Sequence, residues 1–187
     1  MRTDVIIVSD SLPFADKAIP SPTDMIIYDI AANPFMACES AEMNIERISE
    51  HLSEDCKQFS EKILEVYNAP FARDLGIEIE KISSDEVSLY LDIQPKHINS
   101  RGFVHGGVIY TLMDHSLAFA SNLCGEAVGQ SSNIIYHRPV KEGRLYSKLT
   151  IINKSKSLLI YDVKVTCNGK LIASSTLTAF RLPGDGR

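Results

Sequence analysis

A long apolar stretch that follows two consecutive glycines constrains the fold of this chain more than any other feature. Residues 108–123 contain no proline and are interrupted by polar side chains only at Thr111, Asp114, His115, Ser116, Ser121 and Asn122. Such a segment predicts a helix that starts near Gly106, is buried nearly all round and stops at Gly125. A helix of this kind has to be covered by another layer on most of its sides.

Segments in which apolar and polar residues alternate flank this helix. Before it, residues 77–82 and 87–93 alternate around the turn residues 83–86, which predicts a β-hairpin. After it, Asn168-Gly169 is suited to a type I′ turn. Four strands are expected there, at about 128–137, 144–153, 158–167 and 170–181. This order predicts an α+β protein with a curved antiparallel sheet wrapped around the helix.

The N-terminal part of the chain has a different pattern. Residues 1–40 carry several prolines and short apolar runs, and we assign them no function; we expect an extension that packs on the main domain or on a partner. From 41 to 68, apolar residues recur at steps of three or four, which predicts one amphipathic helix that Pro70 ends near Asn68. The sequence thus divides into an extension, 1–69, and a main domain, 70–187.

Composition sets limits on function. Apolar residues make up 44% and charged residues 23%, which favours a packed core. A net charge of −5 argues against a nucleic-acid partner, since neutralising phosphates needs a basic face. No apolar run approaches the roughly 20 residues of a membrane span or forms a signal-peptide core, so we expect a cytoplasmic protein. The scattered Cys38, Cys56, Cys124 and Cys167 are expected to be reduced thiols.

The residues most suggestive of chemistry surround the start of the apolar helix. Asn99 and the run His105-Gly106-Gly107 precede it, and Asp114 lies two turns inside it. Glycines at a helix N-terminus let backbone N–H groups approach a ligand that develops negative charge, as in an oxyanion hole. A carboxylate among apolar neighbours needs a partner or a wet cleft. Asp114 is therefore either a catalytic group or a structural hydrogen-bonding one.

Asn99, Gly102, His105-Gly106-Gly107 and Asp114, together with the stretch Tyr136-His137-Arg138-Pro139, resemble a known family. This pattern is similar to that of the hotdog-fold acyl-CoA thioesterases, specifically their PaaI-like branch, and it extends from about Pro70 to Pro183. The resemblance implies a hotdog fold that pairs into a homodimer, often with two dimers in a homotetramer, and active sites at the subunit interface.

The resemblance also implies roles for single residues. Asp114 would activate water or attack the thioester directly, opposite the loop of the other subunit, and Gly106 would donate its N–H to the carbonyl with Gly107 assisting close approach. Asn99 would orient the water or the carbonyl, and His105 would support the loop or bind near the thioester. Family members often carry a serine or threonine where this chain has Gly129; Ser131, expected on the same strand face, is the substitute candidate.

Substrate and ligand expectations complete the prediction. Basic residues that could attract the CoA phosphates are Arg138, Lys141, Arg144, Lys154 and Lys156, the alternative being a solvated charged rim. The acyl group is expected to meet Tyr110, Met113, Leu117 and Phe119. No metal site is expected at the histidines, and no cofactor beyond the CoA moiety of the substrate.

Two other functions stay open at this point. One is a non-catalytic acyl-CoA sensor, although residues 1–67 lack a basic recognition helix. The other is a hotdog enoyl-CoA hydratase, which needs an Asp and a His five residues apart, whereas Asp114 and His115 are adjacent.

Overall fold

The computed structural model describes residues 43–123 and 125–182, and they form one compact unit. The expectations for residues 1–42, for Cys124 and for residues 183–187 fall outside this range. Helical elements precede the sheet: α1 (Ile45–Glu50), the 3₁₀ turn η4 (Glu54–Phe59), α2 (Ser60–Tyr67) and α3 (Pro70–Leu75). The hairpin strands β1 (Ile77–Ile82) and β2 (Glu86–Asp92) follow, and then the short turn η5 (Pro95–His97). The long helix and the last strands are α4 (Gly106–Asn122), β3 (Ala127–Tyr136), β4 (Arg144–Lys154), β5 (Leu158–Cys167) and β6 (Lys170–Arg181).

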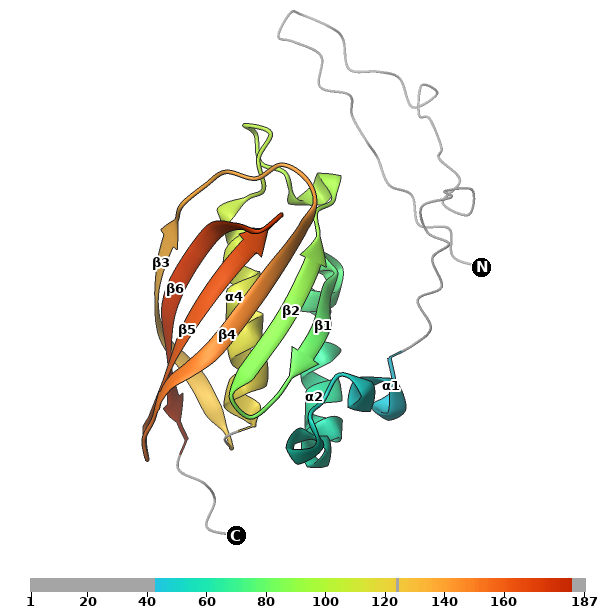
Figure 1. Cartoon of the computed structure of the whole chain (residues 1–187), viewed down its shortest axis with the longest axis vertical. Helices are drawn as coiled ribbons and strands as arrows, with labels where there is room; N and C mark the ends of the chain where they lie inside the picture. The colour runs from blue at the N-terminus through green and yellow to red at the C-terminus, as the bar shows by residue number, and fades with distance from the viewer. Residues whose placement is uncertain (1–42, 124, 183–187) are drawn as a thin grey trace, which may run out of the picture. The chain divides into compact units, whose positions relative to one another are not determined.

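In the described part of the chain, six antiparallel strands form a single sheet in the order β1-β2-β4-β5-β6-β3. Figure 1 shows the curved sheet with α4 lying along one of its faces. This is the predicted hotdog fold. The hairpin and all four later strands begin and end within one residue of their expected positions. The central helix starts at Gly106 as predicted and ends at Asn122, three residues before the expected stop at Gly125. Asn168 and Gly169 both have positive φ, 49° and 71°, as the predicted type I′ turn requires.

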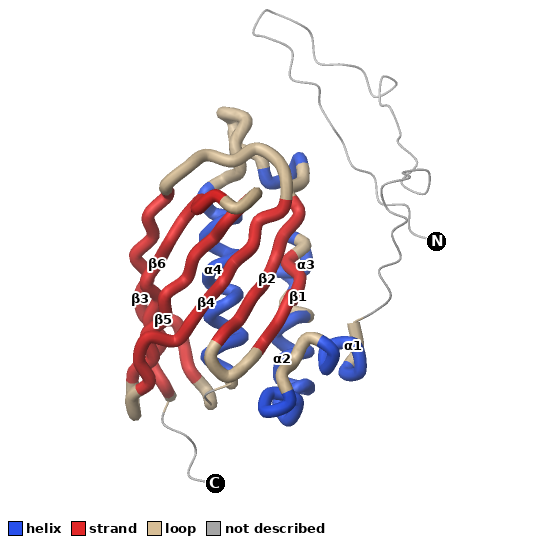
Figure 2. Tube along the Cα trace, viewed as in Figure 1, coloured by secondary structure: helices blue, strands red, loops and turns tan. Residues whose placement is uncertain are grey.

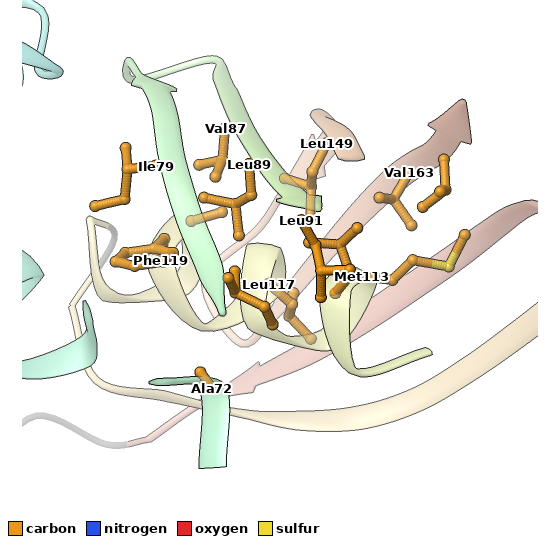
Figure 3. Packing of buried hydrophobic residues seen from close by; sticks show 14 of the residues in the cluster. Ala72, Ile79, Val87, Leu89, Leu91, Met113, Leu117, Phe119, Leu149 and Val163 are labelled. Carbon is orange, nitrogen blue, oxygen red and sulfur yellow. The ribbon is translucent and has the colours of Figure 1, made fainter. Parts of the chain in front are cut away.

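The apolar side chains between α4 and the sheet form the core. Figure 3 shows Met113, Leu117 and Phe119 of α4 in one cluster with Leu89 and Leu91 of β2. Leu112, Met113 and Phe119 have no exposed surface at all. Burial of a side chain of this size stabilises the fold by about 1.5–3 kcal/mol relative to its exposure. The alternation of apolar residues in the strands and the apolar face of α4 therefore hold the two layers together.

The predicted helix 41–68 is wrong as one continuous element. The structure interrupts it after α1, because residues 51–53 turn to pair with the end of β1. The Ser53 N–H donates to the Ile82 carbonyl at 2.9 Å, and the Ile82 N–H donates to the His51 carbonyl at 2.9 Å. These bonds to a strand compete with helical ones and end the helix. The buried face was nonetheless predicted, since Ile48, Cys56 and Ile63 are in the core.

Residues 43–69 belong to the same hydrophobic core as the main domain, and Figure 2 shows these helical elements beside β1 and α4. A polar cluster adds to the contact: the Tyr67 hydroxyl and the Arg73 guanidinium both donate to the Glu78 carboxylate, at 2.7 and 2.6 Å. The guanidinium also lies 4.0 Å from the Tyr67 ring centre. Asn68 caps α2 as expected, and Pro70 then opens the short helix α3, which sequence patterns did not predict.

Two of the four cysteines fall in the described range. Cys56 and Cys167 are buried free thiols. No helix in residues 43–123 or 125–182 is both long and apolar enough to span a bilayer.

Candidate active site

His105 and the two glycines after it build the start of α4. His105 is the N-cap, and its Nδ1 accepts a hydrogen bond from the Gly107 N–H at 2.9 Å. Since Nδ1 accepts, the neutral imidazole carries its proton on Nε2. A side chain at position 107 would put its Cβ 3.0 Å from His105 Nδ1. A side chain at position 107 would therefore crowd the imidazole that caps the helix.

Gly106 lies under a tyrosine from the end of β3. The Tyr136 hydroxyl donates to the Gly106 carbonyl at 3.1 Å, and a Cβ on Gly106 would lie 3.2 Å from that hydroxyl oxygen. The Gly106 N–H has no hydrogen-bond partner within the described parts of the chain. It is therefore an available donor at the positive end of a 17-residue helix.

Asn99 holds the loop that leads to this helix. Its side-chain oxygen accepts from the backbone N–H groups of Arg101 and Phe103, at 2.8 and 3.2 Å. Its own N–H donates to the Phe103 carbonyl at 2.7 Å, and Gly102 supplies the left-handed conformation the loop needs, with φ of 77°. The side-chain oxygen of Asn99 is thus used inside the loop, and its amide NH₂ remains the group that could reach a ligand.

Asp114 lies on the side of α4 that the sheet leaves open. On the opposite side Ser116 is buried and its hydroxyl lies 2.8 Å from that of Ser147 on β4, which fixes the rotation of the helix. Two residues turn a helix by about 200°, so Asp114 points away from β4. Its side chain has no hydrogen bond or ion pair among residues 43–123 and 125–182. Desolvation by neighbouring groups raises the pKa of the Asp114 carboxyl above its ordinary range.

The expected face of Ser131 is wrong. A β-bulge at Gln130 separates Gly129, which lies opposite Ala179, from Ser131, which lies opposite Thr178. The extra residue reverses the alternation, so Gly129 faces α4 while Ser131 faces away from it. The Ser131 hydroxyl accordingly bonds that of Thr178, at 2.8 Å on the outer face. Ser132 is the serine that the bulge turns toward the α4 side.

Most of the expected acyl-binding residues lie in the core. Met113, Leu117 and Phe119 are buried, and Phe119 packs edge-on against the His115 ring at 4.9 Å between centroids. Tyr110 alone of the four is exposed, by 38%. Its place one turn before Asp114 on α4 puts it next to Tyr136, whose pKa is raised by desolvation and by Tyr110. Tyr110 and Tyr136 therefore form an aromatic pair beside the open stripe of α4, by which we mean the side of the helix that the sheet does not cover and on which Asp114 lies.

The five basic residues fall into separate groups. Arg138 and Lys141 lie in the connection after β3; an Arg138 N–H donates to the Leu171 carbonyl at 2.9 Å, and the Lys141 ammonium lies 4.9 Å from the Phe103 ring centre. Arg144 forms a two-pronged ion pair with Asp92, both N–O distances being 2.7 Å. Lys154 and Lys156 follow at the other end of β4, an 11-residue strand about 35 Å long. They are therefore far from Gly106 within one subunit.

Tyr136 is the residue of this site that sequence reasoning missed as a functional group. The sequence drew attention to it only as part of the stretch that resembles the family. Tyr136 lies two residues after Ile134 in a strand, so the two side chains are expected on the same face of the sheet. Within the described ranges, no three His, Cys, Asp or Glu side chains come together in a way that could hold a metal ion.

Comparison with known proteins agrees with this geometry. The family model of the thioesterase superfamily matches residues 101–173, which include α4 and its glycines. Human acyl-coenzyme A thioesterase 13 is 31% identical over 116 residues, covering 58% of this chain and 82% of the human protein. The phenylacetic acid degradation protein PaaI of Thermus thermophilus, solved as a variant, is 34% identical with a TM-score of 0.59, covering 60% of this chain and 99% of that one. A thioesterase of Haemophilus influenzae is 25% identical with a TM-score of 0.61, covering 68% and 94%.

Together with a sheet wrapped on a central helix, these matches identify the class: the chain belongs to the thioesterase superfamily. Within the superfamily it is a PaaI-like hotdog thioesterase, an enzyme that hydrolyses thioesters.

Proposed function

We propose that the protein hydrolyses acyl-CoA thioesters, with Asp114 as general base or nucleophile and the Gly106 N–H as the oxyanion donor. The observation that carries this proposal is the available Gly106 N–H at the start of the same helix that bears an open, unpaired carboxylate. A raised pKa for that carboxyl makes it a better proton acceptor once it is ionised. The acyl-CoA substrate is the one named for the human relative.

The spacing along α4 supports a site shared between two subunits. Gly106 and Asp114 are about 12 Å apart along the helix axis. A thioester carbonyl has to lie within about 3.5 Å of both the donor and the attacking group, so one helix cannot provide both. Gly106 of one subunit would then act with Asp114 of another.

The edge strand β3 supports a homodimer as the functional unit. Among the strands that the structure describes, β3 has a neighbour on one side only, β6, and it is largely exposed on both faces. Ile135 and Tyr136 are exposed by 57% and 52%, which is unusual for an apolar strand edge in an isolated molecule. Pairing of β3 with β3 of a second copy across a two-fold axis would cover this edge. Association of two dimers into a tetramer stays a prediction from the family resemblance.

The CoA part of the substrate would be held by Arg138 and Lys141. Both lie in the connection from β3 to β4, whose Val140 carbonyl accepts from the Val104 N–H at 2.8 Å, just before α4 begins. Their side chains are exposed at the end of the molecule where Gly106 lies, and phosphate oxygens bind such cations.

The two other functions have less support. A hydratase would need the Asp and His side chains to converge, whereas His115 is buried against Phe119 and Asp114 lies on the open stripe. A sensor has no use for a helix that carries both an available N–H group at its start and, two turns further on, a carboxylate without a partner in the described residues. The described helices before β1 contain only four basic residues, Arg47, Lys57, Lys62 and Arg73, the last of which is paired with Glu78.

The first experiment measures thiol release from a panel of acyl-CoA thioesters. Asp114→Asn should lower turnover by roughly 10²–10⁴-fold, the usual effect of losing a general base, while substrate binding persists. Asp162→Asn, which changes a carboxylate on the outer face of β5, is the matched control and should leave turnover unaltered. A protein that hydrolyses no member of the panel, or an Asp114→Asn variant with full turnover, contradicts the proposal.

A second experiment tests whether the site is shared. Asp114→Asn and Gly106→Ala subunits should each be inactive alone, the latter because its methyl group meets Tyr136. When both are unfolded and refolded together, a mixed dimer has one intact site, so a random mixture should regain about a quarter of the normal activity. The two variants carry different affinity tags, so that mixed dimers can be isolated on both tags in turn. No recovery of activity in these mixed dimers, or full activity in a species that light scattering shows to be a monomer, would rule out the cross-subunit arrangement.

A further inference from the structure

Both polar atoms of one peptide group at the start of α4 are held by side chains. The peptide that joins Gly106 to Gly107 has its carbonyl bonded by the Tyr136 hydroxyl at 3.1 Å and its N–H bonded to His105 Nδ1 at 2.9 Å. The two side chains come from different elements, the N-cap of α4 and the end of the edge strand β3. This peptide is the one directly after the available Gly106 N–H.

The local sequence explains why such a double restraint matters. Two glycines in succession have the greatest backbone freedom, and glycine is a poor helix former, by about 1 kcal/mol per residue relative to alanine. The first N–H groups of a helix also lack helical partners. Without restraint, the torsions at Gly106 would vary and its N–H would change direction. Stabilisation of an oxyanion depends on donors that are already oriented before the reaction.

We infer that Tyr136 is a positioning residue of the enzyme: its hydroxyl, together with His105, locks the Gly106-Gly107 peptide and so fixes the direction of the Gly106 N–H. This inference rests on the proposed role of that N–H in thioester hydrolysis. Tyr136 acts through the backbone and contacts no reacting atom in this role. Burial and the nearby Tyr110 raise the pKa of the Tyr136 hydroxyl, which keeps it protonated as a donor.

The inference also explains the sequence of the glycine pair. A Cβ on Gly106 would lie 3.2 Å from the Tyr136 hydroxyl oxygen and 3.3 Å from the ring carbon that carries it. Tyrosine and glycine thus fit one another, since a side chain at 106 would crowd the ring and push its hydroxyl away from the Gly106 carbonyl. A hydroxyl 30 residues further along the chain is thereby brought to the carbonyl of the first helical residue.

The test is Tyr136→Phe, which removes the hydroxyl and keeps the ring. We expect kcat to fall by roughly 10–10²-fold, less than the 10²–10³-fold typical of deleting an oxyanion donor outright. KM should change by less than about 3-fold, because the hydroxyl does not bind the ground state of the substrate. Tyr146→Phe, the same change on an exposed tyrosine of the outer face of β4, should leave kcat unaltered. An unchanged kcat in Tyr136→Phe overturns the inference.

A spectroscopic readout separates positioning from direct contact with the substrate. In ¹⁵N spectra of the protein without substrate, the amide signals of Gly106 and Gly107 should shift or broaden in Tyr136→Phe, and their hydrogen exchange should become faster. A lowered kcat with unchanged glycine signals would mean that Tyr136 acts on the substrate itself, which overturns the positioning role. If the unaltered protein hydrolyses no acyl-CoA, the proposed function fails, while the glycine signals still decide whether Tyr136 holds the peptide.

A double variant tests whether the two side chains act on the same peptide. Combining Tyr136→Phe with His105→Ala should reduce kcat by less than the product of the two separate effects, because the peptide is already released by either change. Independent effects that multiply fully would show that His105 and Tyr136 do not share one restraint, and the double restraint would then be wrong.

Discussion

The hydroxyl groups of Ser131 and Thr178 lie 2.8 Å apart on the outer face of the sheet, while the next serine along β3 faces the opposite way. Ser132 lies four residues before Tyr136, about 13 Å along the strand, and Asp114 lies about 12 Å along α4 from Gly106. Because Tyr136 contacts Gly106 and β3 returns along α4, we expect Ser132 to lie near the level of Asp114. We therefore expect Ser132, and not Ser131, to be the serine that orients the attacking water molecule.

We predict that Ser132→Ala lowers turnover by about 10-fold or more, and that Ser131→Ala leaves it unchanged. Both changes remove one hydroxyl from neighbouring exposed positions, so each serves as the control for the other. Steady-state kinetics on the best substrate of the panel provides the measurement. A larger effect for Ser131→Ala would show that the bulge does not determine which serine serves the site.

The raised pKa of Asp114 leads to a prediction for stability. A carboxyl whose pKa is higher in the folded than in the unfolded chain binds protons more readily when folded, so stability is lost as the pH rises through that range. At pH 7 the charged carboxylate then opposes folding. Asp114→Asn should raise the melting temperature at pH 7, and the gain should shrink as the pH falls toward the ordinary range of an aspartate. A lowered melting temperature would instead indicate a structural hydrogen bond.

The buried His115 ring leads us to expect the opposite pH dependence of stability, namely a loss as the pH falls. Burial, and to a smaller degree the charge of Arg73, lower the pKa of its ring from 6.5 to about 4. Its Nε2 is buried without a hydrogen-bond partner in the described part of the chain. As the pH falls from 6.5 to about 4, only the unfolded chain binds a proton here, and the fold loses on the order of 3 kcal/mol.

The variant His115→Leu should remove this loss, measured as unfolding free energy from denaturant titrations across that pH range. His137→Gln, at an exposed histidine after β3, should keep it. Equal slopes for the unaltered protein and His115→Leu would show that the ring is protonated in the folded state.

The basic residues should differ in their effect on substrate binding. The Arg144 guanidinium forms a bidentate ion pair with the Asp92 carboxylate, whereas the Lys141 ammonium lies over the Phe103 ring, beside the start of α4. We expect Lys141→Ala to raise KM several-fold, with an effect that weakens at high salt, and Arg144→Gln to change KM little. Salt titrations of KM would measure this. A larger effect for Arg144→Gln would place the CoA phosphates on the outer edge of β2 and β4.

The period of the apolar residues was sufficient to predict those helices and strands whose burial pattern is contained in their own sequence. The alternation in β5 and β6 and the unbroken apolar run of α4 reflect burial against one another, and both are visible in the sequence. The break between α1 and η4 is different, because it depends on hydrogen bonds to Ile82, some thirty residues away. Apolar spacing is the same in a helix and in helical pieces that share a buried face.

The site was predictable to a similar extent. Glycines after a histidine, and an aspartate two turns on, pointed to the start of α4. The face of Ser131 could not be read from the sequence, since Gln130 has no residue-type signal for a bulge and one extra residue reverses every side chain before it. Tyr136 was hidden for a related reason: its contact with Gly106 depends on the strand lying beside the helix.

The strand order has a consequence for the time at which the site forms. Within residues 43–123 and 125–182, the sole strand that pairs with β3 is β6, which follows it in the sequence after β4 and β5. While those strands are unformed, β3 has no backbone partner in its own chain, and Tyr136 cannot be carried to Gly106. Pairing over such a sequence separation is slow compared with local hairpins, here β1 with β2 and β5 with β6. During refolding, burial around Phe119 should therefore precede the return of enzyme activity.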